Sequence, residues 1–154
     1  MMEWEDERFF DDADEYFSTL ISAIHEAQVS VDFEVYIFEK SKIGDTLLKA
    51  FQEAAQRGVR VRLLVDGFGR IGFLESYSAQ IVGFEAKVYH PVPWKYWKTV
   101  KAEASREWWP GTFFQLLASM NSRDHRKVCI VDGERAVLGS YNVTYVHLKS
   151  TSQE

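Results

Sequence analysis

The chain has 154 residues, of which 46% are hydrophobic and 15% aromatic, and its formal net charge is −5 at pH 7. This length and composition are typical of one globular domain with a substantial core, and no apolar run reaches the roughly 20 residues of a membrane-spanning helix. The acidic balance argues against nonspecific nucleic-acid binding, for which Lys and Arg must neutralise several phosphates.

The first half of the chain predicts alternating helices and strands. Residues 1–11 are expected to be an acidic leader without the basic and apolar regions of a signal peptide. After Asp12, a candidate N-cap, apolar residues recur at helical spacing. The elements expected next are a strand over 29–38, a helix around 47–54 that ends at Gly58, a strand over 59–65, a helix over 74–82 and a strand over 86–89. This order predicts an α/β sandwich with a mostly parallel sheet.

Ligands of such sheets bind at the carboxyl ends of the strands. Here these ends carry Glu39, Asp66 and His90. We expect the two carboxylates to be capping or loop residues rather than catalytic ones, and His90 to be structural.

Residues 91–122 form an insertion in which aromatic and basic residues alternate. Its tryptophans include Trp94, Trp97, Trp108 and Trp109. Aromatic rings beside lysines suit the headgroup zone of a membrane, so one interpretation is a lip that contacts lipid. The alternative is a loop and helix packed on the protein's own core.

A β-hairpin is predicted after the insertion, because the apolar runs 128–131 and 136–138 flank the turn dipeptide Asp132-Gly133. Two registers are plausible, with the turn centred on 132–133 or on 133–134. In both registers four polar residues share one face, and Val128, Ile130 and Val137 take the other. The polar set is His125, Lys127, Ser140 and Asn142.

An imidazole, an ammonium and two short polar side chains suit phosphoryl transfer without a metal, because the imidazole can attack phosphorus while the cation holds its oxygens. On an extended strand the Cα atoms of His125 and Lys127 lie about 6.6 Å apart, so one phosphate can bridge them. Asp132 falls on the opposite face, and its role is open between a turn residue and a catalytic carboxylate. Cys129, the single cysteine, is expected to pack rather than react.

The spaced pattern His125-x-Lys127, then Asp132, then Gly139-Ser140-x-Asn142 resembles the phospholipase D superfamily, and most closely the N-terminal half of a bacterial cardiolipin synthase-type phosphatidyltransferase. The resemblance extends to residues 31–38, 43–48, 57–67 and 123–127. It implies a phospholipase D-like domain over 12–148, a short tail over 149–154, and the motif on a hairpin.

The resemblance also implies a mechanism. His125 would attack a phosphodiester to form a covalent phosphohistidine, and Lys127, Ser140 and Asn142 would hold phosphate oxygens. Asp132 belongs to the family's catalytic motif. No metal or other cofactor is expected. The leaving group would be protonated by the histidine of a second motif, and H-x-K with its downstream Asp occurs once here.

The expected substrate is therefore a phospholipid, with phosphatidylglycerol converted to cardiolipin or hydrolysed, and the expected partners are a membrane surface and a second motif from a missing half or a homodimer. The domain is expected to be incomplete and the chain to be cytoplasmic and peripheral to the membrane. Two alternatives stay open: a catalytically incomplete phosphate- or lipid-binding module, and a single-motif homodimeric phosphodiesterase or nuclease. Nucleic acid is the less favoured substrate.

Overall fold

A computed structural model describes residues 6–67, 73–89 and 124–144. The described helices are α1 (Ala13–Glu26), α2 (Lys42–Gln56) and α3 (Phe73–Tyr77). The described strands are β1 (Ser30–Val35), β2 (Arg60–Asp66), β3 (Glu85–Tyr89), β4 (Lys127–Val131) and β5 (Arg135–Leu138). The predicted β-α-β-α-β order followed by a hairpin is therefore confirmed, with β1 and α3 shorter than the sequence pattern indicates.

The five strands form one mixed sheet in the order β3-β2-β1-β4-β5. β1, β2 and β3 pair in parallel, and β4 is antiparallel to both β1 and β5. Every strand except β4 thus runs in one direction, which agrees with the mostly parallel sheet that was expected. The sheet brings the hairpin beside β1, although almost 100 residues separate them along the chain.

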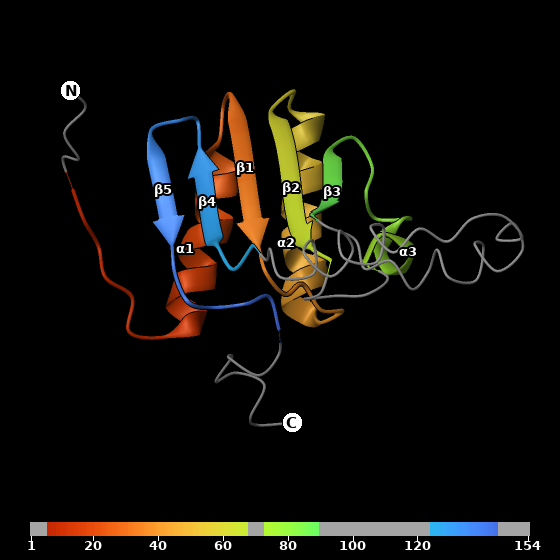
Figure 1. The fold of residues 1–154 in the computed structure, drawn as a ribbon. Helices are drawn as coiled ribbons and strands as arrows, with labels where there is room; N and C mark the ends of the chain where they lie inside the picture. The colour runs from red at the N-terminus through yellow and green to blue at the C-terminus, as the bar shows by residue number, and fades with distance from the viewer. Residues whose placement is uncertain (1–5, 68–72, 90–123, 145–154) are drawn as a thin grey trace, which may run out of the picture.

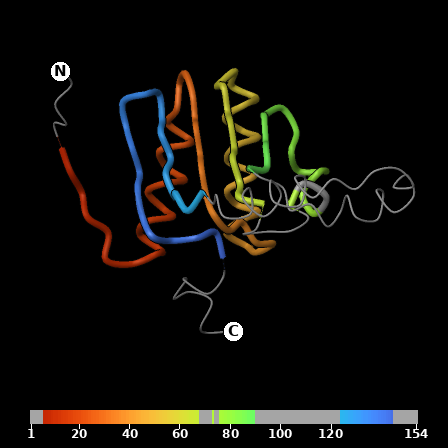
Figure 2. The backbone as a smooth tube through the Cα atoms, viewed as in Figure 1, coloured from red at the N-terminus to blue at the C-terminus, as the bar shows by residue number. Residues whose placement is uncertain are grey.

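Helices α1 and α2 cover one face of the sheet (Figures 1 and 2). Local signals explain where they begin, since the Asp12 side chain accepts a hydrogen bond from the Glu15 N–H at 2.8 Å and caps α1. Ser41 caps α2 in the same way through the Gly44 N–H. Gly58 follows α2 with a φ of +90°, the left-handed conformation that commonly ends a helix.

The core lies between the helices and the sheet. Period-two alternation sends one side of each strand inward, and the inward residues are almost entirely shielded from solvent: Val31, Phe33, Val35, Val61, Leu63, Val65, Cys129, Val131 and Val137. The helices contribute large apolar residues to the same core, including Phe17, Leu20, Ile24, Leu47 and Phe51.

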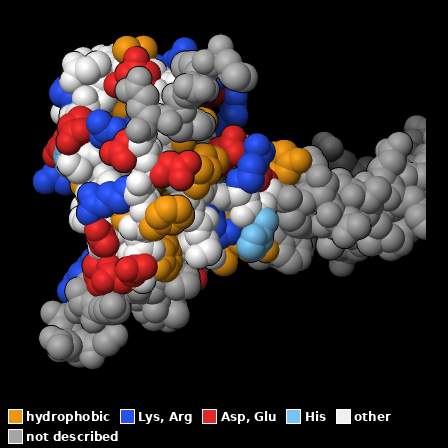
Figure 3. Space-filling view, turned by 90° about the vertical axis from the view of Figure 1, so that its left-hand side faces the viewer, with side chains coloured by type: hydrophobic (Ala, Val, Ile, Leu, Met, Phe, Trp, Pro, Cys, Tyr) orange, Lys and Arg blue, Asp and Glu red, His pale blue; other side chains and the backbone are white. Residues whose placement is uncertain are grey.

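The other face of the sheet has no helix over it within the described residues, and it is more polar. It carries the ion pairs Arg62–Asp32 and Lys87–Glu85. Ile130 and Leu138 are 40% and 66% exposed on the hairpin. Figure 3, seen from the side of the edge strand β5, shows hydrophobic side chains among charged ones at the surface. None of the described helices is long and apolar enough to cross a membrane.

The hairpin register differs from both registers predicted above. Cys129 pairs with Val137 and Val131 pairs with Arg135, which leaves the three-residue loop 132–134. Asp132 and Gly133 have φ values of +57° and +72°, so two consecutive left-handed residues make this loop possible. Shifting a strand by one residue turns every side chain to the other face. Val137 therefore joins the buried face, and the prediction that Ser140 and Asn142 share the face of His125 by strand pairing is wrong.

Candidate functional site

The predicted motif lies where the carboxyl ends of β1 and β2 meet the start of β4. Lys127 is the first residue of β4 and pairs with Val35, the last residue of β1. His125 precedes the strand by two residues, and Asp66 ends the neighbouring strand β2. The site thus occupies the edge of the sheet where ligands bind in folds with parallel strands.

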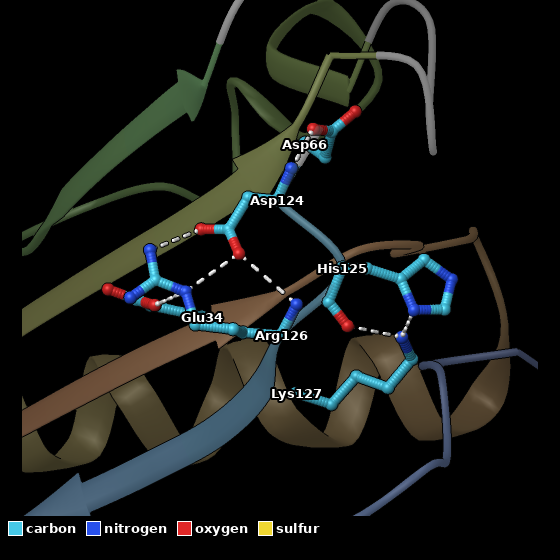
Figure 4. A network of polar contacts seen from close by, with 6 residues as sticks. All are labelled: Glu34, Asp66, Asp124, His125, Arg126 and Lys127. Atoms are coloured by element: carbon cyan, nitrogen blue, oxygen red, sulfur yellow. Dashed lines mark hydrogen bonds and ion pairs between the residues drawn. The ribbon is translucent and has the colours of Figure 1, made fainter. Parts of the chain in front are cut away.

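The spacing predicted that His125 and Lys127 share one side of the chain, and in the structure their side chains are in direct contact (Figure 4). The Lys127 Nζ lies 3.3 Å from the His125 Nδ1 and donates a hydrogen bond to the His125 carbonyl oxygen at 2.8 Å. Lys127 is only 6% exposed, while the His125 side chain is exposed to solvent. Burial lowers the pKa of the Lys127 ammonium, and the nearby Asp124 carboxylate opposes that shift. A buried cation beneath an exposed imidazole is therefore the central feature of the site.

Tyr36 supports this pair from the end of β1. Its ring centroid lies 4.6 Å from that of His125, and the Lys127 Nζ is 5.4 Å from the same ring. The second contact is within the range of a cation–π interaction. Tyr36 falls within the strand expected over 29–38, but sequence reasoning did not assign it to the site. Its position one residue after β1, at the carboxyl edge, was the available signal.

Acidic and basic residues around the pair form a connected network (Figure 4). Asp124 accepts hydrogen bonds from the Arg126 side chain at 2.8 and 2.9 Å, and its own N–H donates to Asp66 at 2.9 Å. The Arg126 guanidinium also lies 3.2 Å from a Glu34 carboxylate oxygen. The Arg126 hydrogen bonds hold the pKa of Asp124 below its usual range despite partial burial. Asp66 is thus a loop-fixing carboxylate, as expected, whereas Glu34 and Arg126 were not predicted to form an ion pair.

The Gly139-Ser140-x-Asn142 segment reaches the same edge of the sheet after leaving β5. The Gly139 N–H donates to the Lys127 carbonyl at 3.2 Å, and the Asn142 Oδ1 accepts from the Ile37 N–H at 3.2 Å. A Cβ on Gly139 would lie 2.9 Å from the Tyr16 ring, so a side chain there would require the segment or the ring to shift. Ser140 is exposed and makes no hydrogen bond within the described residues.

Asp132 lies at the opposite end of β4. Seven residues of about 3.3 Å each separate it from His125, which corresponds to about 23 Å along an extended strand. Its carboxylate accepts hydrogen bonds from the N–H groups of Gln28, Val29 and Ser30 at 3.0, 2.7 and 2.8 Å. These bonds lower the pKa of Asp132. This geometry corresponds to the turn-residue alternative, since the carboxylate ties the hairpin to the connection between α1 and β1.

Several predicted features fall outside the described residues. They include the insertion 91–122 with Trp94, Trp97, Trp108 and Trp109, and also His90 and the tail. Among the residues that the structure does describe, no group of three or more His, Cys, Asp or Glu side chains is arranged to hold a metal ion.

Comparison with known proteins agrees with the motif. A family model described as "Cardiolipin synthase, PLD-like domain" matches residues 20–154. The cardiolipin synthase of Clostridium perfringens strain 13 is 30% identical over 133 residues, which are 86% of this chain and 24% of that protein. Cardiolipin synthase B of Escherichia coli K12 is 25% identical over 149 residues, 96% of this chain and 32% of the relative. The chain thus spans about a quarter to a third of the length of these relatives.

A similar fold occurs in NucT from Helicobacter pylori, with a TM-score of 0.55 and 18% sequence identity, covering 87% of this chain and 70% of that structure. At this identity the likeness concerns the fold alone. The family model, in contrast, matches most of the sequence, including the whole hairpin. The chain therefore belongs to the phospholipase D-like domain family of cardiolipin synthase.

Proposed function

We propose that this chain supplies one half of a phosphodiester-transfer site in which His125 is the nucleophile and a phospholipid is the substrate. The observation that carries the proposal is the contact between the exposed His125 imidazole and the buried Lys127 ammonium, at 3.3 Å. A phosphate group beside that contact would meet a nucleophile and a cation together. Membership in the cardiolipin synthase domain family supports a phosphatidyl group as the part transferred.

The proposed reaction has two displacement steps. An imidazole nitrogen of His125 attacks phosphorus, a P–N bond forms, and the P–O bond to the leaving alcohol breaks as that alkoxide takes a proton. An acceptor hydroxyl then attacks the phosphohistidine and loses its proton, and the P–N bond breaks to restore the imidazole. An alcohol such as a second phosphatidylglycerol gives transfer, and water gives hydrolysis.

Lys127 is proposed to neutralise charge on the phosphate oxygens throughout. Because its Nζ is already held by the His125 carbonyl and is shielded from water, little reorganisation is needed when charge develops. We keep Ser140 and Asn142 as proposed phosphate-binding residues. The Asn142 carbonyl group is engaged by the Ile37 N–H, which leaves its amide NH₂ to act as the donor. Asp132 is proposed as a positioning residue.

The leaving group needs an acid, which we propose comes from a second copy of the motif. That copy would belong to another part of the protein or to a second chain, since the relatives are three to four times as long as the matched segment. A phospholipid substrate also implies contact with a membrane surface, for which the aromatic insertion 91–122 is the proposed element.

The rival function is a binding module that retains the phosphate site but has no acid. Incubation of the purified chain with vesicles of labelled phosphatidylglycerol separates the two. If the chain is an enzyme, we expect labelled cardiolipin or phosphatidic acid to form, together with an acid-labile labelled adduct on the chain. The products and the adduct should all be absent in His125→Ala. The matched control is His25→Ala, an exposed histidine on α1 that pairs with Glu53.

Binding to the vesicles without an adduct or product, in a folded chain, would favour the module and refute turnover by this half alone. Product that persists in His125→Ala would refute the nucleophile. Incubation of the same preparation with single-stranded DNA tests the nuclease alternative. Cleavage that depends on His125 would indicate that nucleic acid, and not the lipid, is the substrate.

A further inference from the structure

His125 lies outside the hydrogen-bonded ladder of the sheet. The last pair between β1 and β4 joins Val35 and Lys127, so residues 124–126 have no strand partner. A backbone segment without ladder bonds needs other partners to keep one conformation. The proposed nucleophile would otherwise lie on a free segment at the edge of the sheet, and the network on the opposite side of this segment supplies the missing partners.

The first partner is Asp66, at the end of β2. β1 separates β2 from β4 in the sheet, yet the Asp66 carboxylate reaches past the end of β1 and accepts the Asp124 N–H at 2.9 Å. Asp66 is 1% exposed and Asp124 is 8% exposed, so water competes little for this bond. The residue before His125 is thereby tied to a strand two positions away.

The second partner is Arg126, on the other side of His125. The Asp124 carboxylate accepts the Arg126 N–H at 3.1 Å, which closes a local turn around His125, and it also accepts two hydrogen bonds from the guanidinium. A bidentate arginine–carboxylate contact is stronger and more directional than a single ion pair. The guanidinium then reaches Glu34 on β1 at 3.2 Å.

Side-chain alternation places this network on the side of the chain opposite to the His125 and Lys127 side chains. Glu34 pairs with Val128, and Arg126 precedes Val128 by two residues, so Glu34 and Arg126 lie on the face of the sheet away from α1 and α2. His125 and Lys127 point to the other side, as Figure 4 shows. The network's hydrogen bonds and ion pairs run among its own side chains and the backbone N–H groups of residues 124 and 126, so its effect on the His125 imidazole passes through the backbone.

We propose that Glu34, Asp66, Asp124 and Arg126 form a clamp that fixes the backbone on both sides of His125 and so sets the imidazole against Lys127 and Tyr36. These four are positioning residues. The consequence for reaction rests on the proposed function of His125, whereas the consequence for imidazole geometry does not. An alternative role for Arg126 is to bind a headgroup, but its guanidinium, although 67% exposed, is already paired with Asp124 and Glu34.

The test uses Arg126→Lys and Asp124→Asn in the full chain. Lysine keeps the positive charge but cannot make the two parallel hydrogen bonds of the planar guanidinium. Asparagine keeps an acceptor oxygen for the local turn but lacks the negative charge of the carboxylate. The matched control is Arg62→Lys, because Arg62 pairs with Asp32 across neighbouring strands on the same face but has no contact with residues 124–126. Folding of each variant is checked by circular dichroism and thermal unfolding.

Two measurements are made on each variant. Hydrolysis of bis(4-nitrophenyl) phosphate should lose about ten- to a hundred-fold in kcat with KM within about twofold, since a misplaced catalytic group costs rate rather than binding. The NMR signals of the His125 ring should shift and broaden in Arg126→Lys and Asp124→Asn but keep their wild-type positions in Arg62→Lys.

Unchanged His125 ring signals in both clamp variants would overturn the proposal, whatever the activity. Equal losses of kcat in Arg62→Lys would also overturn it, since the effect would then be general to this face. If the wild-type chain has no activity, turnover by this half alone fails, and if His125→Ala retains the activity, the proposed nucleophile fails. In either case the ring signals alone decide whether the clamp exists.

Discussion

Replacement of Asp132 separates a catalytic carboxylate from a structural one. The residue belongs to the spaced motif, but its side chain accepts hydrogen bonds from the backbone N–H groups of residues 28–30, and about 23 Å of extended strand separates it from His125. Asp132→Asn keeps one acceptor oxygen and tolerates the φ of +57°, and removes the charge. Asp132→Ala removes every acceptor. Comparison of the two variants therefore separates the effect of losing the charge from the effect of losing the hydrogen bonds.

The magnitude follows from the hydrogen bonds. A hydrogen bond to a charged group contributes about 1.5–3 kcal/mol. Because the three hydrogen bonds to Asp132 are partly exposed to solvent, we expect their combined contribution to be about 3 kcal/mol, not three times the single-bond value. We expect Asp132→Asn to lower the free energy of unfolding by about 1–2 kcal/mol. Asp132→Ala should cost about 3–4 kcal/mol, because a left-handed conformation without a polar side chain adds about 1 kcal/mol.

The assay is urea unfolding followed by far-ultraviolet circular dichroism, with Glu134→Gln as the control. Glu134 is an exposed carboxylate in the same three-residue loop, so this change should alter stability by less than about 0.5 kcal/mol. Below the unfolding transition, Asp132→Asn should retain its kcat to within about threefold. A loss of more than a hundred-fold in kcat at unchanged stability would refute the structural role and restore the catalytic one.

The same variant has a predicted pH dependence. The pKa of Asp132 is lower in the folded chain than the ordinary aspartate value of about 3.9, so the folded state favours the carboxylate. Its contribution to stability is complete above that value and is lost as pH falls through the lower, folded pKa. The stability difference between wild type and Asp132→Asn should thus be constant from pH 5 to 8 and shrink below about pH 4; a difference that grows on acidification would contradict this sign.

Three further predictions concern the packing around the site. Tyr36→Ala should lower kcat/KM by about tenfold, because it removes the ring against His125, and Tyr36→Phe should retain it, since the contacts involve the ring face; equal losses in both would implicate the hydroxyl instead. Gly139→Ala should cost about 1–3 kcal/mol in urea unfolding, because its Cβ would lie 2.9 Å from the Tyr16 ring, and wild-type stability would show that the segment can move. Burial raises the pKa of the Cys129 thiol to about 12, so 5,5′-dithiobis(2-nitrobenzoic acid) should react at pH 8 only after unfolding; rapid reaction in the native chain would contradict this burial.

Much of the fold could be predicted because its signals are local. The cap at Asp12, the period-two pattern of 31–35 and the helical spacing of α2 each depend on neighbours within a few residues. The hairpin shows the limit of such reasoning. The existence of the hairpin follows from two apolar runs and Asp132-Gly133. The length of its loop does not, because two-residue and three-residue hairpin loops are both common. The actual register reverses the faces of β5.

The candidate site likewise has a part that local sequence predicts and a part that only long-range packing creates. The placement of His125 and Lys127 on one side of the chain follows from their spacing of two residues, whereas their direct contact is seen only in the structure. Tyr36, Glu34 and Asp66 join them only because β1 and β2 end beside the start of β4. Asp132 meets residues 28–30 across more than 100 positions of the chain.

The sequence by itself thus determined the elements, the family and the pair of residues proposed to react, because periodicity, caps and motif spacing are properties of neighbouring residues. Only the tertiary structure decided which residues support that pair, which face each hairpin residue takes, and that Asp132 anchors a connection rather than reaching the imidazole. Those outcomes depend on strand order and register, which are set by packing between segments far apart in the chain.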